Sequence, residues 1–153
     1  ALIVWGKNSS FFTREIDISG HHIIQSLSRE DDIDYEVANN KIKESGLSSF
    51  TPKKNDGDES SIAIEQRTIY NDLVDEIRKT LRFYMKNNNQ SFFNNFYITG
   101  GSSVTPGLNE FIASSLNVTV HSLDPFKKIQ KLANIENSEQ YSIAIGLALR
   151  GLE

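Results

Sequence analysis

The chain has 153 residues, of which 38% are hydrophobic and 24% charged, and a formal net charge of −4, which is ordinary for one globular domain with a buried core. Its weak acidity and its lack of lysine and arginine runs argue against a nucleic-acid partner, and the absence of cysteine excludes disulfides and thiol chemistry. The longest apolar stretches are too short to span a membrane, and a start at Ala1 inside an apolar run suggests a piece cut from something longer.

The first third of the chain predicts a β-hairpin followed by two helices. Residues 1–5 are a continuous apolar run, typical of a strand that is buried on both faces. Residues 11–18 are expected to form the second strand of the hairpin. Apolar residues at helical spacing then predict a helix over residues 21–29 and another from an N-cap at Asp34 to a stop at Gly46.

A polar stretch and a long helix are predicted next. Residues 48–60 carry proline, glycine and alternating charge without any apolar period, so we expect a mobile surface loop. Residues 61–86 are predicted to form the longest helix, which we interpret as a core helix ended by the asparagines at 87–89. Its expected apolar stripe recurs mostly every fourth position: Ile62, Ile69, Leu73, Ile77, Leu81 and Met85.

The three histidines do not predict a metal site. His21 and His22 are neighbours, and neighbouring side chains on a helix point apart, whereas zinc-binding pairs are three or four residues apart. His121 is distant in the sequence. We interpret all three as structural or solvated histidines.

A strand, two glycines and a helix start follow one another after residue 95. Apolar residues 96–98 predict a short buried strand, and Gly100 and Gly101 allow a sharp turn and the close approach of a ligand. Thr105 and Pro106 fit the N-cap and the first position of a helix. Such a unit directs free N–H groups at one spot, which suits a phosphate or ribose. A Gly-Gly pair is also typical of an ordinary tight turn, so both interpretations stay open from the residues alone.

The remainder predicts that Asn117 ends the helix begun at Pro106, followed by a strand at residues 118–121 and a last helix from a cap at Asn137 or Ser138 through Leu149. Its small residues, of which Gly146 is the smallest, allow close packing on a sheet. In chain order the prediction is hairpin, helices, strand, helix, strand and helix. This order favours an α/β fold with a mixed sheet.

Four stretches, taken in order, resemble the C-terminal lobe of the PilM family, the actin-like ATPases of type IV pilus assembly. Residues 35–46 are similar to the family's helix that leans over the adenine, and residues 98–108 are similar to its adenosine motif. The other two are residues 11–16 with Ser19-Gly20, and the ending at residues 123–126 and 141–152. The resemblance implies the second lobe of an actin-like (RNase-H-like) fold, with a mixed sheet and a helical insertion.

The resemblance also implies a division of the chain. Residues 1–20 and 90–153 would form an RNase-H-like α/β subdomain that lacks its first strand, and residues 21–89 an inserted helical subdomain. The lacking strand would lie between the strands at residues 1–5 and 96–99, so we expect these two not to pair directly. The exposed edges of these two strands would then pair with a second copy of the chain, forming a homo-oligomer, or with the protein's own N-terminal half.

The nucleotide-binding residues are implied by the same resemblance. They are Gly100, Gly101, Ser102 and Ser103 of the adenosine motif, with Asn39, Lys41 and Lys43 on the adenine helix. ATP and Mg²⁺ would be cofactors of the complete protein. The phosphate motifs, the metal-binding acids and any catalytic residue would belong to sequence before Ala1, so none is assigned here and enzymatic activity stays open. Asn39 stands where the family usually has Glu, and Ile42 where it usually has Lys.

The function implied is a nucleotide-gated scaffold on the cytoplasmic face of the bacterial inner membrane. There it would bind the cytoplasmic tail of the inner-membrane pilus protein PilN, mainly through the half that would precede Ala1. Two alternatives stay open: another actin-like scaffold, of the FtsA cell-division or GspL type II secretion kind, and an interaction module that has lost nucleotide. The residues at 39 and 42 favour the second alternative.

Overall fold

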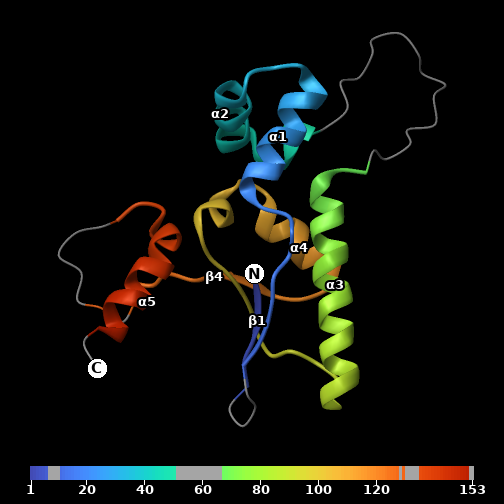
Figure 1. Cartoon of the computed structure of the whole chain (residues 1–153), viewed down its shortest axis with the longest axis vertical. Helices are drawn as coiled ribbons and strands as arrows, with labels where there is room; N and C mark the ends of the chain where they lie inside the picture. The colour runs from blue at the N-terminus through green and yellow to red at the C-terminus, as the bar shows by residue number, and fades with distance from the viewer. Residues whose placement is uncertain (7–10, 51–66, 128, 130–134, 152–153) are drawn as a thin grey trace. The chain divides into compact units, whose positions relative to one another are not determined.

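The computed structural model describes residues 1–6, 11–50, 67–127, 129 and 135–151, which form helices and two small sheets (Figure 1). The mixed α/β class is as predicted. The chain divides into two compact units, Ala1–Ala38 with Ser48–Phe92 and Asn39–Leu47 with Phe93–Glu153. The division implied by the resemblance, 1–20 with 90–153 and 21–89, has other bounds and stays a prediction.

The first unit begins with the predicted hairpin. Strand β1 (Leu2–Val4) pairs antiparallel with β2 (Phe12–Arg14), and Ile3 lies opposite Thr13. Leu2 and Val4 are buried, whereas Ile3 is 64% exposed. The prediction of a strand buried on both faces is therefore wrong, because only one face of the hairpin is covered. Strand β2 is also shorter than the predicted residues 11–18, because Leu2 already pairs with Arg14 and β1 offers little beyond it.

Helix α1 (Gly20–Asp31) begins at a capping box. The Ser19 N–H donates to His22 Nδ1 (3.2 Å), and the His22 N–H donates to Ser19 Oγ (3.4 Å). Each group satisfies an orphan donor of the first turn. The neighbouring His21 points elsewhere, with Nδ1 3.2 Å from the Tyr35 hydroxyl. These contacts confirm a structural role for both histidines.

Helix α2 (Tyr35–Ser45) has the predicted ends. Asp34 accepts the Glu36 N–H on its carboxylate (2.9 Å) and the Ala38 N–H on its carbonyl (2.9 Å), as an N-cap does. Gly46 follows the last helical residue with a left-handed φ of 57°, which is the usual conformation of a glycine stop. Both boundary predictions are confirmed.

Helix α3 (Ile69–Asn88) starts later than residue 61, the predicted start. Residues 51–66 lie outside the described residues, but Arg67 and Thr68 precede the helix, and the Thr68 N–H donates to Asn71 Oδ1 (2.9 Å) as a cap contact. The end at Asn89, with φ of 49°, confirms the predicted asparagine stop. Of the predicted stripe, Ile77 is confirmed as buried. The other residues that α3 buries most each lie next to a predicted position instead of on it: Tyr70, Val74, Thr80 and Tyr84.

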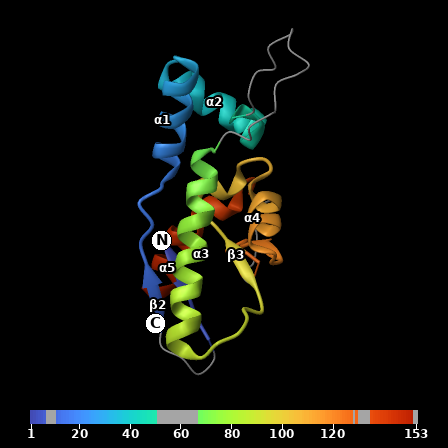
Figure 2. The same ribbon diagram turned by 90° about the vertical axis from the view of Figure 1, so that its right-hand side faces the viewer.

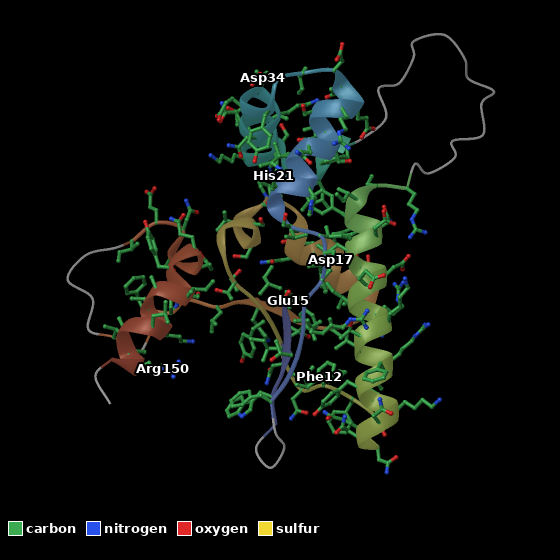
Figure 3. The ribbon with its side chains drawn as sticks, in the orientation of Figure 1. Phe12, Glu15, Asp17, His21, Asp34 and Arg150 are labelled. Atoms are coloured by element: carbon green, nitrogen blue, oxygen red, sulfur yellow. The ribbon has the colours of Figure 1, made fainter. Side chains whose placement is uncertain are left out.

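Aromatic contacts hold α3 in the first unit. Strand β2 lies beside α3 (Figure 2). Its Phe12, labelled in Figure 3, packs against Phe83 and Tyr84, with ring centroids 6.2 and 5.3 Å apart. Phe50 meets Tyr70 edge-on at 5.3 Å. Phe50 ends a short 3₁₀ helix, η1 (Gly46–Phe50), and is buried. The loop predicted from residue 48 therefore does not begin there, and its remainder lies outside the described residues.

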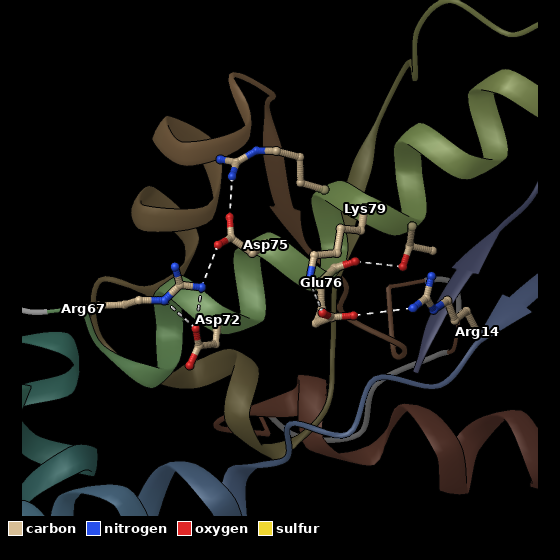
Figure 4. Close-up of polar contacts among 8 residues, drawn as sticks. Arg14, Arg67, Asp72, Asp75, Glu76 and Lys79 are labelled. Atoms are coloured by element: carbon tan, nitrogen blue, oxygen red, sulfur yellow. Dashed lines mark hydrogen bonds and ion pairs between the residues drawn. The ribbon is translucent and has the colours of Figure 1, made fainter.

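The polar face of α3 carries a chain of ion pairs (Figure 4). Arg67 reaches Asp72 (2.6 Å) and Asp75 (2.8 Å), and Arg78 also reaches Asp75 (2.6 Å). The hydrogen bond and charge of Asp72 raise the pKa of the Arg67 guanidinium. Because these groups are open to solvent, each pair adds little to stability, and the network mainly orients side chains.

The second unit contains a parallel pair of strands joined by a helix. Strand β3 (Phe96–Ile98) pairs with β4 (Val120–Ser122), and α4 (Leu108–Leu116) connects them. Asn117 ends α4 with φ of 54°, as predicted. The Val118 N–H still bonds to Ala113 of that helix end (3.1 Å), so β4 begins later than residue 118. Within the described ranges β3 pairs with β4 alone, and the strand expected between β1 and β3 stays a prediction.

The chain then forms a 3₁₀ turn, η3 (Ser138–Tyr141), and helix α5 (Ser142–Arg150). No residue of α5 is buried, and Ile143 is 78% exposed. The prediction that its small residues pack on a sheet is therefore wrong for the described structure. None of the helices described is long and apolar enough to cross a membrane.

Candidate functional site

The predicted glycine turn follows β3 directly. Gly100 has φ of 100° and ψ of 174°, a conformation that side-chain-bearing residues rarely adopt. Its N–H donates to the Glu139 carbonyl (3.0 Å). Gly101–Val104 then form the 3₁₀ turn η2. The sharp reversal expected at the end of the strand is present, and glycine is required at its first position. We call Gly100–Val104 the glycine loop.

The two serines of the glycine loop differ in what they offer to a ligand. Ser103 is buried, and its N–H (3.1 Å) and hydroxyl (2.7 Å) both donate to the Gly100 carbonyl. Its backbone N–H is therefore not presented outward, contrary to our expectation. Gly101 and Ser102 are exposed, and their N–H groups meet no acceptor within the described part of the chain. The open donors are those of Gly101 and Ser102.

The space beside the glycine loop is open. A methyl group added at Gly100 or Gly101 would have no other atom of the described chain within 4 Å. Gly101, unlike Gly100, does not have a positive φ. Neither packing nor backbone conformation in the described structure thus requires glycine at position 101. A ligand lying against the main chain would require it.

The turn after the glycine loop corrects one prediction. Thr105 and Pro106 do not start helix α4, whose N-cap is Gly107 with φ of 80° and ψ of −6°. The Leu108 N–H donates to the Thr105 carbonyl (3.2 Å). Proline second and a left-handed glycine third are the signature of a type II β-turn. We call residues 105–108 the proline turn.

The proline turn joins the two sequence-distant parts of the predicted site. The Leu47 N–H, just after α2, donates to the Pro106 carbonyl (3.2 Å). The segment 39–47 and the glycine loop accordingly belong to one compact unit. The structure therefore brings both groups of predicted residues into the same unit.

The predicted residues of α2 do not share one face. Asn39 and Lys43 are four residues apart, so they lie one above the other, whereas Lys41 projects about 200° away from either. Ile42 is only 6% exposed and belongs to the core. Only one of the two lysines can therefore face the same ligand as Asn39, and that lysine is Lys43. Lys41 already has an interaction partner.

Sequence reasoning missed a polar cluster behind the glycine loop. The hydroxyls of Thr99 (3.0 Å) and Ser142 (2.9 Å) both bond to the Glu139 carbonyl, which also accepts the Gly100 N–H, and the two hydroxyls bond to each other. The cluster fixes the first residue of the loop to η3 and α5. Thr99 and Ser142 both lie in stretches that carry the family resemblance, but the Glu139 carbonyl, forty residues from Thr99, gives no local sequence signal.

The described groups at this site can bind a ligand through hydrogen bonds and charge. They are backbone N–H groups, the Ser102 hydroxyl and the ammonium and amide groups on α2. Within the described ranges no group of three or more histidines and carboxylates is placed to hold a metal ion. Such donors suit an anionic or hydroxyl-rich ligand.

One comparison with known proteins identifies a family. The model of the family described as type IV pilus assembly protein PilM matches residues 1–152. A search of curated proteins found no match.

Proposed function

The chain belongs to the PilM family of type IV pilus assembly proteins, and from this premise we propose that it forms the nucleotide-binding C-terminal lobe of an actin-like scaffold. In this proposal the glycine loop receives the ribose and phosphates of ATP. Lobes of this kind close on ATP and Mg²⁺ from two sides, so the remaining phosphate and metal contacts would come from the other lobe.

The observation that carries the proposal is the open main chain at Gly101. Its N–H and that of Ser102 meet no acceptor within the described chain, and a methyl group added at position 101 would meet no other atom of that described chain within 4 Å. Unpaired donors beside a glycine with free space suit phosphate or ribose oxygens. Two glycines in succession would also allow the ligand to approach the backbone closely.

Helix α2 would supply the contact with the base. Asn39 and Lys43 lie on one face of it, and the bond from Leu47 to the proline turn holds its end in the unit of the glycine loop. An amide and an ammonium can donate to ring nitrogens and ribose hydroxyls. Asn39 replaces a carboxylate, so we expect weaker binding of the ribose than the family pattern would give.

The scaffold role follows from the family rather than from the site. We propose that the complete protein lies at the cytoplasmic face of the inner membrane and binds the cytoplasmic tail of PilN. Nucleotide would act as a gate on that interaction. A pull-down with a peptide of the PilN tail tests this gating. The amount of protein retained on the peptide should change when ATP is added, and an unchanged amount would argue against gating.

A second candidate is a pilus scaffold that no longer binds nucleotide. The burial of Ile42 favours it, because the family's lysine position has become part of the core. A buried side chain there cannot be exchanged for a solvent-facing ammonium without large cost. Calorimetry distinguishes the two candidates.

The experiment is titration calorimetry of ATP·Mg²⁺ into the full-length protein and its Gly101→Val variant. The Cβ of the valine enters space that the described chain leaves empty, so we expect folding to be kept while the ligand's approach is blocked. We expect at least a roughly tenfold loss of affinity, which corresponds to one or two lost hydrogen bonds.

The matched control is Gly146→Val, an exposed glycine of α5 with no other atom within 4 Å of an added methyl. It should bind ATP as the wild type does. Equal affinity of wild type and Gly101→Val, with both proteins folded by circular dichroism, would rule out the glycine loop and favour the second candidate.

A further inference from the structure

The end of helix α2 is locked to the proline turn by a glycine that has no room for a side chain. Gly46 is buried and left-handed, with φ of 57°. A methyl group on it would lie 2.0 Å from the Pro106 carbonyl oxygen and 2.8 Å from Pro106 Cβ. No alternative side-chain rotamer can relieve the first contact, because the atom met belongs to the backbone.

A hydrogen bond also fixes the orientation of this contact between Gly46-Leu47 and Pro106, which we call the junction. The Leu47 N–H donates to the Pro106 carbonyl (3.2 Å), and this approach is possible because Gly46 lets the two backbones meet. On the other side of the junction, the Thr105 carbonyl accepts the Leu108 N–H (3.2 Å), which keeps the proline turn closed. The last turn of α2 and the residues after the glycine loop are therefore fixed in register with each other.

We propose that Gly46 is a positioning residue for the nucleotide site. It touches no ligand, and it acts by holding Lys43 and Asn39 of α2 at one distance from the glycine loop. This inference rests on the proposed nucleotide site. It assigns Gly46 a selectivity role: recognition of the base depends on the junction, whereas recognition of the phosphates by Gly101 and Ser102 depends on it less.

The test compares Gly46→Ala with wild type in the full-length protein by two readouts. The first is amide hydrogen exchange, which needs no ligand, and we expect the Leu47 and Leu108 amides to exchange at least about tenfold faster in the variant. The second is calorimetry with ATP and with tripolyphosphate. We expect ATP affinity to fall roughly tenfold, with a much smaller change for tripolyphosphate.

The control is Gly146→Ala, the same substitution at an exposed helix position of the same unit, which should change neither readout. Unchanged exchange at Leu47 and Leu108 in Gly46→Ala would overturn the junction itself. Equal losses for ATP and tripolyphosphate would overturn the positioning role and leave a purely structural one. If the wild-type protein binds neither ligand, the proposed nucleotide site fails, while the exchange readout still decides the junction.

Should Gly46→Ala fail to fold, Pro106→Ala serves in its place. This variant keeps the acceptor carbonyl and the Cβ that lies nearest Gly46, but it frees the φ that the proline ring fixes and so loosens the proline turn. The same changes are expected at smaller amplitude, about threefold in exchange and in ATP affinity. No change in either readout would overturn the proposal.

Discussion

The second unit contains two glycine sites that look alike in the sequence and differ in the structure. At Gly46 the backbone is left-handed and neighbouring backbone atoms leave no room for a methyl group. At Gly101 the backbone does not have a positive φ, and an added methyl would meet nothing within 4 Å. Gly100 differs from both, because it has a positive φ of 100° with an extended ψ of 174°, and an added methyl would have no other atom of the described chain within 4 Å.

The difference between Gly46 and Gly101 shows two separate reasons why a position can be occupied by glycine. Gly46 serves the packing of the protein itself, so its replacement should cost stability. Gly101 has no such role in the described structure, so its replacement should cost ligand affinity instead. Substitutions at these positions can break or sharpen this comparison.

The largest effect is expected from Gly46→Ala. An alanine pays about 1–2 kcal/mol for the left-handed conformation, and the contact with Pro106 adds an overpacking cost of about 1–3 kcal/mol. We expect a loss of roughly 3 kcal/mol in the free energy of unfolding, measured by urea denaturation. A loss below about 1 kcal/mol would mean that the junction is not closed.

The next largest effect is expected at Tyr70, which is buried in the first unit. Burial raises the pKa of the Tyr70 phenol to about 12, while the unfolded chain has a pKa of about 10. The unfolded state thus loses its proton first, and the stability present in full below pH 10 falls as the pH rises towards 12. The expected loss is about 1.4 kcal/mol by pH 11.

Urea denaturation at pH 8 and pH 11 measures this loss, with Tyr70→Phe as the matched variant that lacks the titrating proton. The phenylalanine variant should lose less stability over the same interval. Equal losses in the two proteins would show that Tyr70 is not the group responsible.

A smaller effect is expected from Gly100→Ala. The space beside Gly100 is open, so only the backbone conformation opposes the alanine, at about 1 kcal/mol. Thermal unfolding should place this variant between the two other glycine variants. A loss as large as that of Gly46→Ala would mean that packing, rather than conformation, restricts position 100.

The smallest effect on stability is expected from Gly101→Ala. With neither a positive φ nor a neighbouring atom, the substitution should change the free energy of unfolding by less than about 0.5 kcal/mol. Thermal unfolding alongside Gly100→Ala provides the measurement. A clear loss at this position would make the glycine a structural requirement and remove its value as a sign of a ligand.

Local signals in the sequence predicted much of the fold. The Asp34 cap, the Gly46 stop and the asparagine at position 117 carry their function in their own side chain or backbone freedom, and each lies where expected. The hairpin was also correct, because an apolar run and an alternating run with a turn between them have few other solutions.

The predictions from sequence were wrong where contacts with other parts of the chain determine the local structure. Pro106 and Gly107 carry the signature of a type II turn, yet proline also begins helices. The positive φ of Gly107 and the bond from the Leu108 N–H to the Thr105 carbonyl show that the turn is formed. The buried face of α3 uses Tyr70, Thr80 and Tyr84, so a search for aliphatic residues placed it one position away. Helix α5 is apolar without being buried, because apolar composition does not supply a partner surface.

The candidate site was predicted as a set of positions, and its geometry was not. The sequence located the two glycines, but it did not show that Ser103 donates inward or that Lys41 and Lys43 project from different sides of α2. Both facts depend on the turn η2 and on the helical phase of α2. Together with the bond from the Gly100 N–H to the Glu139 carbonyl, they narrow the predicted ligand contacts to Gly101, Ser102, Asn39 and Lys43.

The most direct test of the nucleotide site is an NMR titration of ATP·Mg²⁺ into the ¹⁵N-labelled full-length protein. The account predicts that the Gly101 and Ser102 amides show the largest shift changes in this lobe, that the inward-donating Ser103 amide shifts less, and that Asn39 responds on α2. An unchanged Gly101 amide at a concentration of ATP that shifts residues elsewhere in the protein would contradict it.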